Sequence, residues 1–293
     1  MNYYKFTSPS EVTKLLKKYN FKCQKYLGQN FLVDQNILKK IINSLQLNRE
    51  ESIFEIGTGI GTLTSALSPL VKKVISIEKD EKLIPILHES LAPYNNINVI
   101  FQDVMNYDLI NFFQESNRNR EKVEKIVGNL PYYISLPLIK KILELNKYIK
   151  LAILLVQKEV GERLIAKVGS KEYGILSLAT QYYSLPEKIH LVPPSVFYPP
   201  PKVNSMLISL KIHSELPVKI NDEKLFFNII KASFQQRRKN LINSLSNYFR
   251  DKIKKTEIEN ILKKIEIDGN RRGETLTLEE FTKLSIAIGE NIK

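Results

Sequence analysis

The chain has 293 residues, 43% of them hydrophobic, and its 44 lysine and arginine residues exceed its 31 acidic residues to give a formal net charge of +13. This length is enough for one large domain or two smaller ones, and the longest apolar run, residues 151–156, is too short to cross a bilayer. The single cysteine, Cys23, excludes an intramolecular disulfide and fits a reducing compartment, so we expect a cytoplasmic protein. The histidines, His88, His190 and His213, are scattered without a Cys or His at ligand spacing, so we expect no metal site.

Basic residues recur in short clusters, at residues 14–25, 117–122, 235–240, 252–255 and 271–272. Any one of these clusters could be the solvated face of a helix. An excess of this size, spread along the whole chain, favours a polyanionic partner, most simply a nucleic acid. A membrane surface is disfavoured because no basic cluster is paired with an exposed apolar face.

From residue 52 to about residue 158, apolar β-rich runs alternate with runs of helical spacing. The predicted strands are residues 52–57, 72–78, 96–103, 122–129 and 150–158, and the predicted helices are residues 62–70, 80–91 and 136–145. Near-continuous apolar strands with helical crossovers predict an α/β fold with a mostly parallel sheet covered on both faces. Residues 187–192 and 203–212 flank a proline-rich stretch and could add antiparallel strands at one edge.

After residue 214 the pattern changes to amphipathic helices with no strands between them. These helices are predicted at residues 222–234, 238–249, 256–265 and 277–288. We therefore expect two domains, an α/β domain of residues 1–214 and a small all-helical domain of residues 215–293.

A glycine-rich turn in the stretch EIGTGIGTLT places Gly57 and Gly59 at the end of the first predicted strand, where bare backbone can approach a ligand. A dinucleotide-binding fingerprint would require glycine where the chain has Thr62. Glu78 and Asp103 end the next two strands, and successive strand ends line one crevice. A carboxylate at the second strand suits ribose hydroxyls and one at the third suits an adenine amino group, although both acids could instead cap the following helices.

The stretch VGNLPYYIS ends the fourth predicted strand with an amide, a proline and two aromatic residues. Asn129 would open onto the same crevice, where its side-chain carbonyl and the main-chain carbonyl of Leu130 are two acceptors. Pro131 restrains the local backbone, and Tyr132 offers a flat face. Two acceptors and a ring suit an adenine extruded from its stack. The alternative is an Asx-turn that ends the strand, with the tyrosines packing at the rim.

The chain resembles the rRNA adenine dimethyltransferase family in motifs that come in the same order: QKYLGQNFLVD, EIGTGIGTLT, SIEKD, QDV, VGNLPYYIS, LLVQKEVGERL, YGILSLATQYY and VPPSVFYPPPKVNS. The C-terminal stretches FQQRRKNLINSL and RRGETLTLEEFTKLS are similar to the KsgA/RsmA branch in particular. The resemblance runs from about residue 26 to residue 288. It implies a Rossmann-like class I methyltransferase fold that uses S-adenosylmethionine as its methyl donor.

The resemblance also implies roles for individual residues. Contacts with S-adenosylmethionine are expected from Asn30, Leu32, Gly57, Gly59, Glu78, Asp103 and Asn129. Asn129, Leu130 and Tyr132 match the family's catalytic motif, and Phe197 matches a second aromatic residue on the other side of the target base. The residue pattern alone reads GQNFLVD as a helix entry capped by Asp34, and reads the second aromatic as a core residue in a proline-stiffened loop.

Members of this branch transfer methyl groups from S-adenosylmethionine to two adjacent adenosines in a hairpin near the 3′ end of small-subunit (16S) rRNA, late in subunit assembly. The resemblance therefore implies an enzyme whose partner is small-subunit rRNA or the pre-30S subunit. We further expect a cytoplasmic monomer that uses neither a metal nor a membrane. The resemblance assigns residues 1–214, including an N-terminal helical extension, to cofactor binding and catalysis. It assigns residues 215–293 to RNA or ribosome binding.

Three alternatives stay open at this point. The erythromycin-resistance branch modifies a large-subunit (23S) rRNA adenosine with the same catalytic parts, but the C-terminal motifs argue against it. A non-catalytic RNA-binding assembly or transcription factor on the same fold would not need the complete set of motif residues. A nicotinamide-dependent oxidoreductase is disfavoured by Thr62 and by the lack of a hydride-relay histidine among the motifs.

Overall fold

The computed structural model describes residues 6–119, 121–236 and 238–291. Arg120 and Arg237, which belong to two of the basic clusters, lie outside these ranges. The chain divides into two compact units. The sheet unit comprises the residues up to Gly161 together with Leu185–Ile212, and the helical unit comprises Glu162–Ser184 together with the residues from His213 onward.

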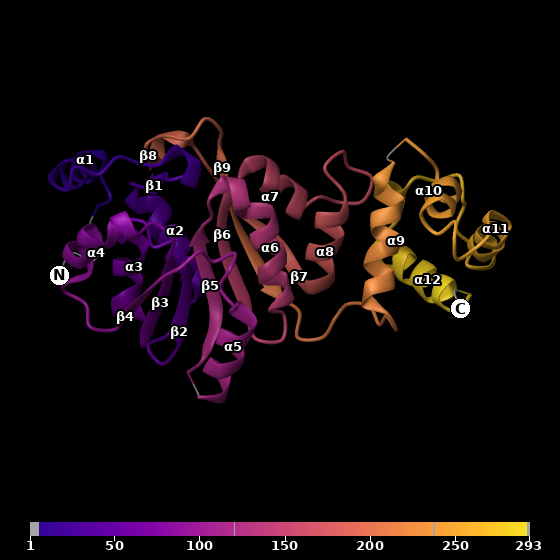
Figure 1. Ribbon diagram of the computed structural model, residues 1–293, viewed down its shortest axis with the longest axis horizontal. Coiled ribbons are helices and arrows are strands. Elements are labelled where there is room, and N and C mark those ends of the chain that lie inside the picture. Colours follow the sequence, from indigo (N-terminus) through magenta and orange to yellow (C-terminus); the bar gives the residue numbers. More distant parts are fainter. Residues whose placement is uncertain (1–5, 120, 237, 292–293) are drawn as a thin grey trace. The chain divides into compact units, whose positions relative to one another are not determined.

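A large sheet lies at the centre of the sheet unit (Figure 1). Its strands among the described residues are, in spatial order, β4 (Ile97–Phe101), β3 (Lys73–Glu78), β2 (Ser52–Ile56), β5 (Val123–Asn129), β6 (Leu151–Gln157), β9 (Ser205–Ile212) and β7 (Ser184–Val192). The pairs from β4 to β6 are parallel, and β9 pairs antiparallel with β6. The prediction of a mostly parallel sheet with an antiparallel addition is confirmed.

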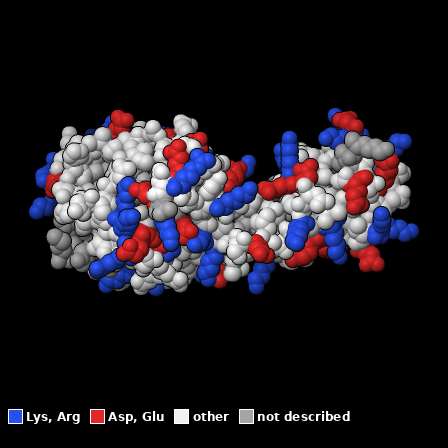
Figure 2. Space-filling view, turned by 90° about the horizontal axis from the view of Figure 1, so that it is seen from below, with Lys and Arg blue, Asp and Glu red and all other residues white. Residues whose placement is uncertain are grey.

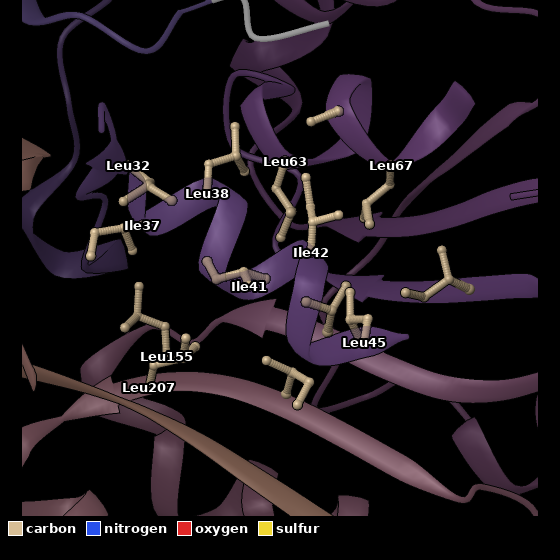
Figure 3. Close-up of a cluster of buried hydrophobic side chains, with 14 of the residues drawn as sticks. Leu32, Ile37, Leu38, Ile41, Ile42, Leu45, Leu63, Leu67, Leu155 and Leu207 are labelled. Carbon is tan, nitrogen blue, oxygen red and sulfur yellow. The ribbon is translucent and has the colours of Figure 1, made fainter. Parts of the chain in front are cut away.

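Helices α2 (Gln35–Leu45) and α3 (Thr62–Leu67) cover one face of this sheet, and α5 (Leu109–Arg118) packs on the other. Successive strand residues point to opposite faces. Accordingly, Ile53 of β2 lies in the core cluster beneath α2 and α3, whereas the ring of Phe54 lies 5.5 Å from that of Phe113 on α5. Figure 3 shows the leucine and isoleucine side chains of α2 and α3 converging on the strands, and each fully buried side chain contributes about 1.5–3 kcal/mol.

A second apolar cluster joins the first helix to the β4 side of the sheet unit. Helix α1 (Pro9–Lys18) buries Val12, Leu15 and Leu16 in this cluster, together with residues of α4 (Ile84–Leu91). Two further helices begin where strands β5 and β6 end: α6 (Ser135–Glu144) and α7 (Lys158–Leu164). The boundary between the two units falls within α7.

A short two-stranded sheet connects segments far apart in the sequence. Strand β1 (Phe31–Leu32) pairs antiparallel with β8 (Phe197–Tyr198), so that Leu32 lies opposite Phe197. The residue pattern indicated only the helix that follows. Asp34 does cap α2, since its carboxylate accepts a hydrogen bond from the Ile37 N–H at 2.9 Å.

The helical unit is made of α8 (Ile175–Tyr183), α9 (Glu223–Gln235), α10 (Leu241–Tyr248), α11 (Lys255–Lys264) and α12 (Leu278–Gly289). The last four lie where amphipathic spacing predicted helices. Residues 162–184 also belong to this unit, although the expected division at residue 214 places them in the first domain. Aromatic packing explains the difference: the ring of Tyr182 lies 5.3 Å from that of Phe226, and the Tyr173 hydroxyl donates to the Leu276 carbonyl at 3.0 Å.

None of the described helices is both long and apolar enough to cross a membrane. Within the described ranges, no group of three or more His, Cys, Asp or Glu side chains is placed to hold a metal ion. Cys23 is a half-buried free thiol, and its burial raises its pKa.

Candidate active site

A cleft opens at the carboxyl ends of β2, β3, β4 and β5. The chain leaves β2 for β3 and β4 on one side and returns to β5 on the other, so the cleft lies at the point where the strand order reverses. Ligands of open α/β sheets bind at this kind of position. Six of the residues singled out in the sequence line the cleft: Asn30, Gly57, Gly59, Glu78, Asp103 and Asn129.

The glycine-rich turn after β2 forms the floor of the cleft and has a left-handed backbone. Gly57 has φ +84° and Gly59 has φ +56°, values at which a side chain would be strained. A Cβ at Gly59 would also lie 3.1 Å from the ring of Phe31, so a larger residue would push against β1. The Gly57 N–H donates to the Ile77 carbonyl at 2.9 Å, which ties the turn to β3. The turn therefore presents backbone, and not side chains, to the cleft.

The Glu78 carboxylate is fixed by three backbone N–H groups. One of its oxygens accepts from Gly59 at 2.9 Å, and the other accepts from Lys79 and Asp80, each at 2.9 Å. Burial raises the pKa of Glu78, and the three N–H groups oppose that rise. The carboxylate thus has one orientation at the end of β3, with lone pairs that remain able to accept from hydroxyl groups.

Asp103 lies just beyond the end of β4 and is also held on both oxygens. Oδ1 accepts from the Met105 N–H at 2.9 Å, and Oδ2 lies 2.8 Å from the Lys79 ammonium. Burial favours the neutral carboxyl, but the Lys79 ammonium and the Met105 N–H outweigh it, and the pKa of Asp103 is lowered. Lys79 was not among the predicted site residues. Its position directly after a strand-end carboxylate was the only signal in the sequence.

The Asn129 side chain reaches across to a segment 99 residues earlier. Its Nδ2 donates to the Asn30 carbonyl at 2.9 Å, which leaves Oδ1 as an acceptor on a residue that lines the cleft. The Asn30 amide in turn donates to the Gly28 carbonyl at 3.0 Å, and Gln29 donates to the Asp80 carboxylate at 2.7 Å. Hydrogen bonds therefore connect residues 28–30 to both the β3 side and the β5 side of the cleft.

The other four predicted residues do not line this cleft. The side chains of Leu32 and Phe197 lie in the main core cluster, where they are 6% and 3% exposed. Leu130 has a buried side chain, and its N–H donates to the Leu155 carbonyl at 3.0 Å. The half-buried Tyr132 hydroxyl is hydrogen-bonded to the Ser205 hydroxyl at 2.6 Å. Of the two aromatic rings predicted to lie on either side of a base, that of Phe197 is thus buried in the core and that of Tyr132 is half-buried.

A second, smaller cavity lies beside the glycine turn and contains an acidic group that the sequence left without a role. Leu32, Asn129 and the fully buried Glu55 line it. Burial raises the pKa of Glu55 to about 8, against the opposing effect of the Thr64 hydroxyl, which donates to Oε2 at 2.6 Å. Among the described residues, Oε1 of Glu55 and the hydroxyl of Thr62 are buried without a hydrogen-bond partner.

The sequence pattern of the ribosomal RNA adenine dimethylase family matches residues 20–284. The chain belongs to this family. It is 45% identical to the ribosomal RNA small subunit methyltransferase A of Geobacillus sp. (strain WCH70), over 96% of this chain and 97% of the relative. It is 44% identical to the protein of the same name from Bacillus mycoides (strain KBAB4), over 96% of each chain.

Solved structures agree with this placement. The dimethyladenosine transferase of Plasmodium falciparum has a TM-score of 0.75 at 26% identity, over 89% of this chain and 98% of that one. The 23S rRNA methyltransferase ErmE has a TM-score of 0.68 at 23% identity, over 89% and 100%, which shows a shared fold. The higher identity to relatives named for the small subunit places the chain in the KsgA/RsmA branch. This family member is an rRNA adenine dimethyltransferase, and S-adenosylmethionine is its methyl donor.

Proposed function

We propose that this protein dimethylates two adjacent adenosines in the hairpin near the 3′ end of 16S rRNA, acting on the small subunit during its assembly. The relatives that match over nearly the whole chain are named for the small subunit. The observation that carries the proposal is the cleft, because it gathers the glycine turn, two fixed carboxylates and Asn129 at one sheet edge. This set suits an adenosine-containing methyl donor beside an amino-bearing base.

S-Adenosylmethionine would be held by residues from four segments of the sheet unit. The turn at Gly57 and Gly59 offers bare backbone, and the Glu78 carboxylate suits the two ribose hydroxyls. Asp103 suits the adenine amino group, and residues 30–32 would cover the methionine part. When bound, the cofactor supplies a methyl group on a positively charged sulfur.

The chain's own contribution to the reaction is orientation of the target amine. The Oδ1 of Asn129 and the main-chain carbonyl of Leu130 would accept the two amino hydrogens, so that the nitrogen lone pair is directed at the methyl group. The same acceptors would stabilise the positive charge that develops on nitrogen, and the proton then leaves to solvent. The adenine amine is unprotonated at neutral pH, so this scheme assigns no side chain the role of general base. Orientation of bound partners lowers barriers by about 7–11 kcal/mol.

Tyr132 and Phe197 would stack on the extruded base, each contact contributing about 1–3 kcal/mol against an extrusion cost of a few kcal/mol. The hydroxyl of the half-buried Tyr132 is hydrogen-bonded to Ser205, and the Phe197 ring is buried in the core. We infer that the segment carrying Phe197 shifts when the base enters. Binding of RNA would therefore complete this part of the site.

The RNA backbone would be bound by the basic residues, with residues 215–293 as the main RNA- or ribosome-binding domain. On the face seen in Figure 2, lysine and arginine side chains occur over both units and are interspersed with acidic ones. Contacts of this kind release counterions, so affinity for the subunit should fall with salt at a log–log slope of about −0.7 to −0.9 per phosphate contacted. Salt-independent binding would contradict this part of the proposal. We further propose a monomeric, cytoplasmic enzyme.

The decisive experiment is mass spectrometry of 16S rRNA from cells that lack this protein, with and without a plasmid that restores it. We expect two dimethyladenosines near the 3′ end to be absent in the deletion strain, restored by the wild-type gene, and not restored by Asn129→Ala. Purified enzyme should label isolated small subunits from labelled S-adenosylmethionine and leave large subunits unlabelled. Labelling of large subunits would instead support the erythromycin-resistance activity.

A further inference from the structure

The loop between β4 and α5 is folded around Asp103. Two N–H groups, those of Asn106 and Tyr107, donate to the Asp103 main-chain carbonyl at 2.9 and 3.0 Å, and the Met105 N–H donates to its carboxylate. Asp108 ends the loop by capping α5 through the Asn111 N–H at 3.0 Å. The loop's own N–H groups are thus directed inward to Asp103. Within the described backbone, the Tyr107 carbonyl accepts from the Leu109 N–H at 3.0 Å, whereas the Val104 and Met105 carbonyls have no backbone donor from the loop.

Lys141 of α6 donates to these three carbonyls. Its ammonium lies 3.1 Å from the Val104 carbonyl, 2.9 Å from the Met105 carbonyl and 2.9 Å from the Tyr107 carbonyl. A lysine ammonium has three hydrogens, so the three carbonyls match its full capacity. The side chain is half-buried, and removing an ammonium from water is costly unless its hydrogens are bonded. The three hydrogen bonds therefore compensate the Lys141 ammonium for its partial burial, and they also restrain the loop.

The neighbouring Lys140 lies on the same helix, but its ion-pair partner is on α6 and not in the loop. Its side chain is 79% exposed, and its partner is Glu144 on the next turn at 3.8 Å. Lys140 thus serves the solvent-exposed side of α6, whereas Lys141 is directed at the loop. The two adjacent residues have the same charge on the same helix but different contacts.

The position of α6 connects the loop to the other side of the cleft. The helix begins at Ser135, whose hydroxyl donates to the Tyr132 carbonyl at 3.0 Å, immediately after the Asn129 motif. Asp103 and Val104, at the loop's start, both line the cleft. Lys141 therefore joins the residues proposed for the cofactor's purine to the helix that follows the residues proposed for the target base.

We propose that Lys141 is a positioning residue that holds residues 103–107 in place, so that Asp103 can select a purine with a 6-amino group. The inference rests on the proposed cofactor role of the cleft. Lys141 is not among the residues that line the cleft, and it acts through the loop backbone. Its positive charge also favours the ionised Asp103, since it contributes to the lowered pKa of that carboxyl. Without the three hydrogen bonds from Lys141, the cleft would still bind purines but would discriminate less between them.

The test compares S-adenosylhomocysteine with S-inosylhomocysteine, which has oxygen in place of the 6-amino group, by calorimetry on the full-length protein. Wild type should prefer S-adenosylhomocysteine by at least about tenfold, because Asp103 can accept from an amino group but not from a carbonyl. Lys141→Met should bind S-adenosylhomocysteine about tenfold more weakly and S-inosylhomocysteine nearly as well as wild type. Lys141→Arg should keep most of the preference, and Lys140→Met, the matched loss of charge, should behave as wild type.

If Lys141→Met keeps the wild-type ratio of the two affinities, the inference is overturned. An equal loss of affinity for both ligands is one such result, and it would mark a general structural role. If Lys141→Met does not fold, Lys141→Gln decides, because its amide is too short to reach all three carbonyls. Hydrogen exchange of the ligand-free protein separates the two proposals. The amides of residues 105–107 should exchange faster in Lys141→Met than in Lys140→Met, whether or not the protein binds S-adenosylhomocysteine. Failure of wild type to bind S-adenosylhomocysteine would refute the cofactor assignment alone.

Discussion

On the side of the cleft proposed for the cofactor, Glu78 and Asp103 stand beside adjacent parallel strands and have their oxygens held by backbone N–H groups and Lys79. On the side proposed for the target base, Asn129 is attached to Asn30 from a distant segment, and Phe197 is buried. The carboxylates proposed for the cofactor line the cleft in fixed orientations, whereas the rings proposed for the base do not line it. The difference predicts that cofactor binding needs no rearrangement and that base binding does.

Asn129→Ala should separate the two sides most clearly. Turnover should fall about 100-fold or more, because the amine loses one of its two orienting acceptors. Affinity for S-adenosylhomocysteine should change by less than about tenfold, since only one hydrogen bond to the Asn30 carbonyl is lost on the cofactor side. Calorimetry and single-turnover methylation of small subunits measure the two quantities, and an equal loss in both would refute the orienting role.

Glu55 should make the stability of the sheet unit depend on pH. Its pKa is about 8 when folded and near 4.5 when exposed, so the folded state holds a proton that the unfolded chain releases. Stability should therefore fall as pH rises from about 4.5 through 8. Linkage gives a loss of about 2 kcal/mol between pH 6 and pH 8.

Glu55→Gln is the matched variant for this measurement, because its amide oxygen can still accept from the Thr64 hydroxyl. Denaturant unfolding at several pH values should show wild type losing stability relative to the variant above pH 6. Parallel pH profiles for the two proteins would show that Glu55 is ionised in the folded state. They would leave the cofactor assignment untouched.

Asp103→Ala should weaken cofactor binding and leave turnover nearly unchanged, the opposite of what we expect for Asn129→Ala. The dissociation constant for S-adenosylhomocysteine should rise about tenfold, as expected for a lost charge-assisted hydrogen bond to the purine amine. Turnover at saturating cofactor should stay within about threefold of wild type. Lys79→Met keeps the carboxylate and removes its ion-pair partner, so we expect it to bind within about threefold of wild type. A turnover defect that saturation does not rescue would place Asp103 in the chemical step.

Tyr132→Phe should have the smallest effect, because the ring that would stack on the base is kept. The variant loses only the hydrogen bond to the Ser205 hydroxyl, which is worth about 0.5–1.5 kcal/mol. We expect turnover to fall up to about tenfold in the subunit methylation assay, with cofactor affinity unchanged. Tyr132→Leu should fall further, and equal rates for the two variants would argue against stacking.

The residue pattern was sufficient for the parallel sheet, the C-terminal helices and the grouping of Gly57, Glu78 and Asp103 in one cleft. Apolar strands and amphipathic helices are periodic, so they can be read locally, and parallel strands bring their carboxyl ends to one edge. The sequence alone therefore predicts that Gly57, Glu78 and Asp103 lie in one crevice. The roles of Asn30 and Phe197 came only from the family resemblance, because no local pattern marks them.

Contacts between segments distant in the sequence could not be read in this way. Three such contacts involve only short segments or single side chains. They are the pairing of β1 with β8, the hydrogen bond from Asn129 to Asn30, and the hydrogen bonds from Lys141 to the loop after β4. Residues 162–184 likewise join the helical unit through aromatic packing that has no periodicity. Such contacts form only once the chain has folded, since they depend on which surfaces meet and not on the spacing within any one segment.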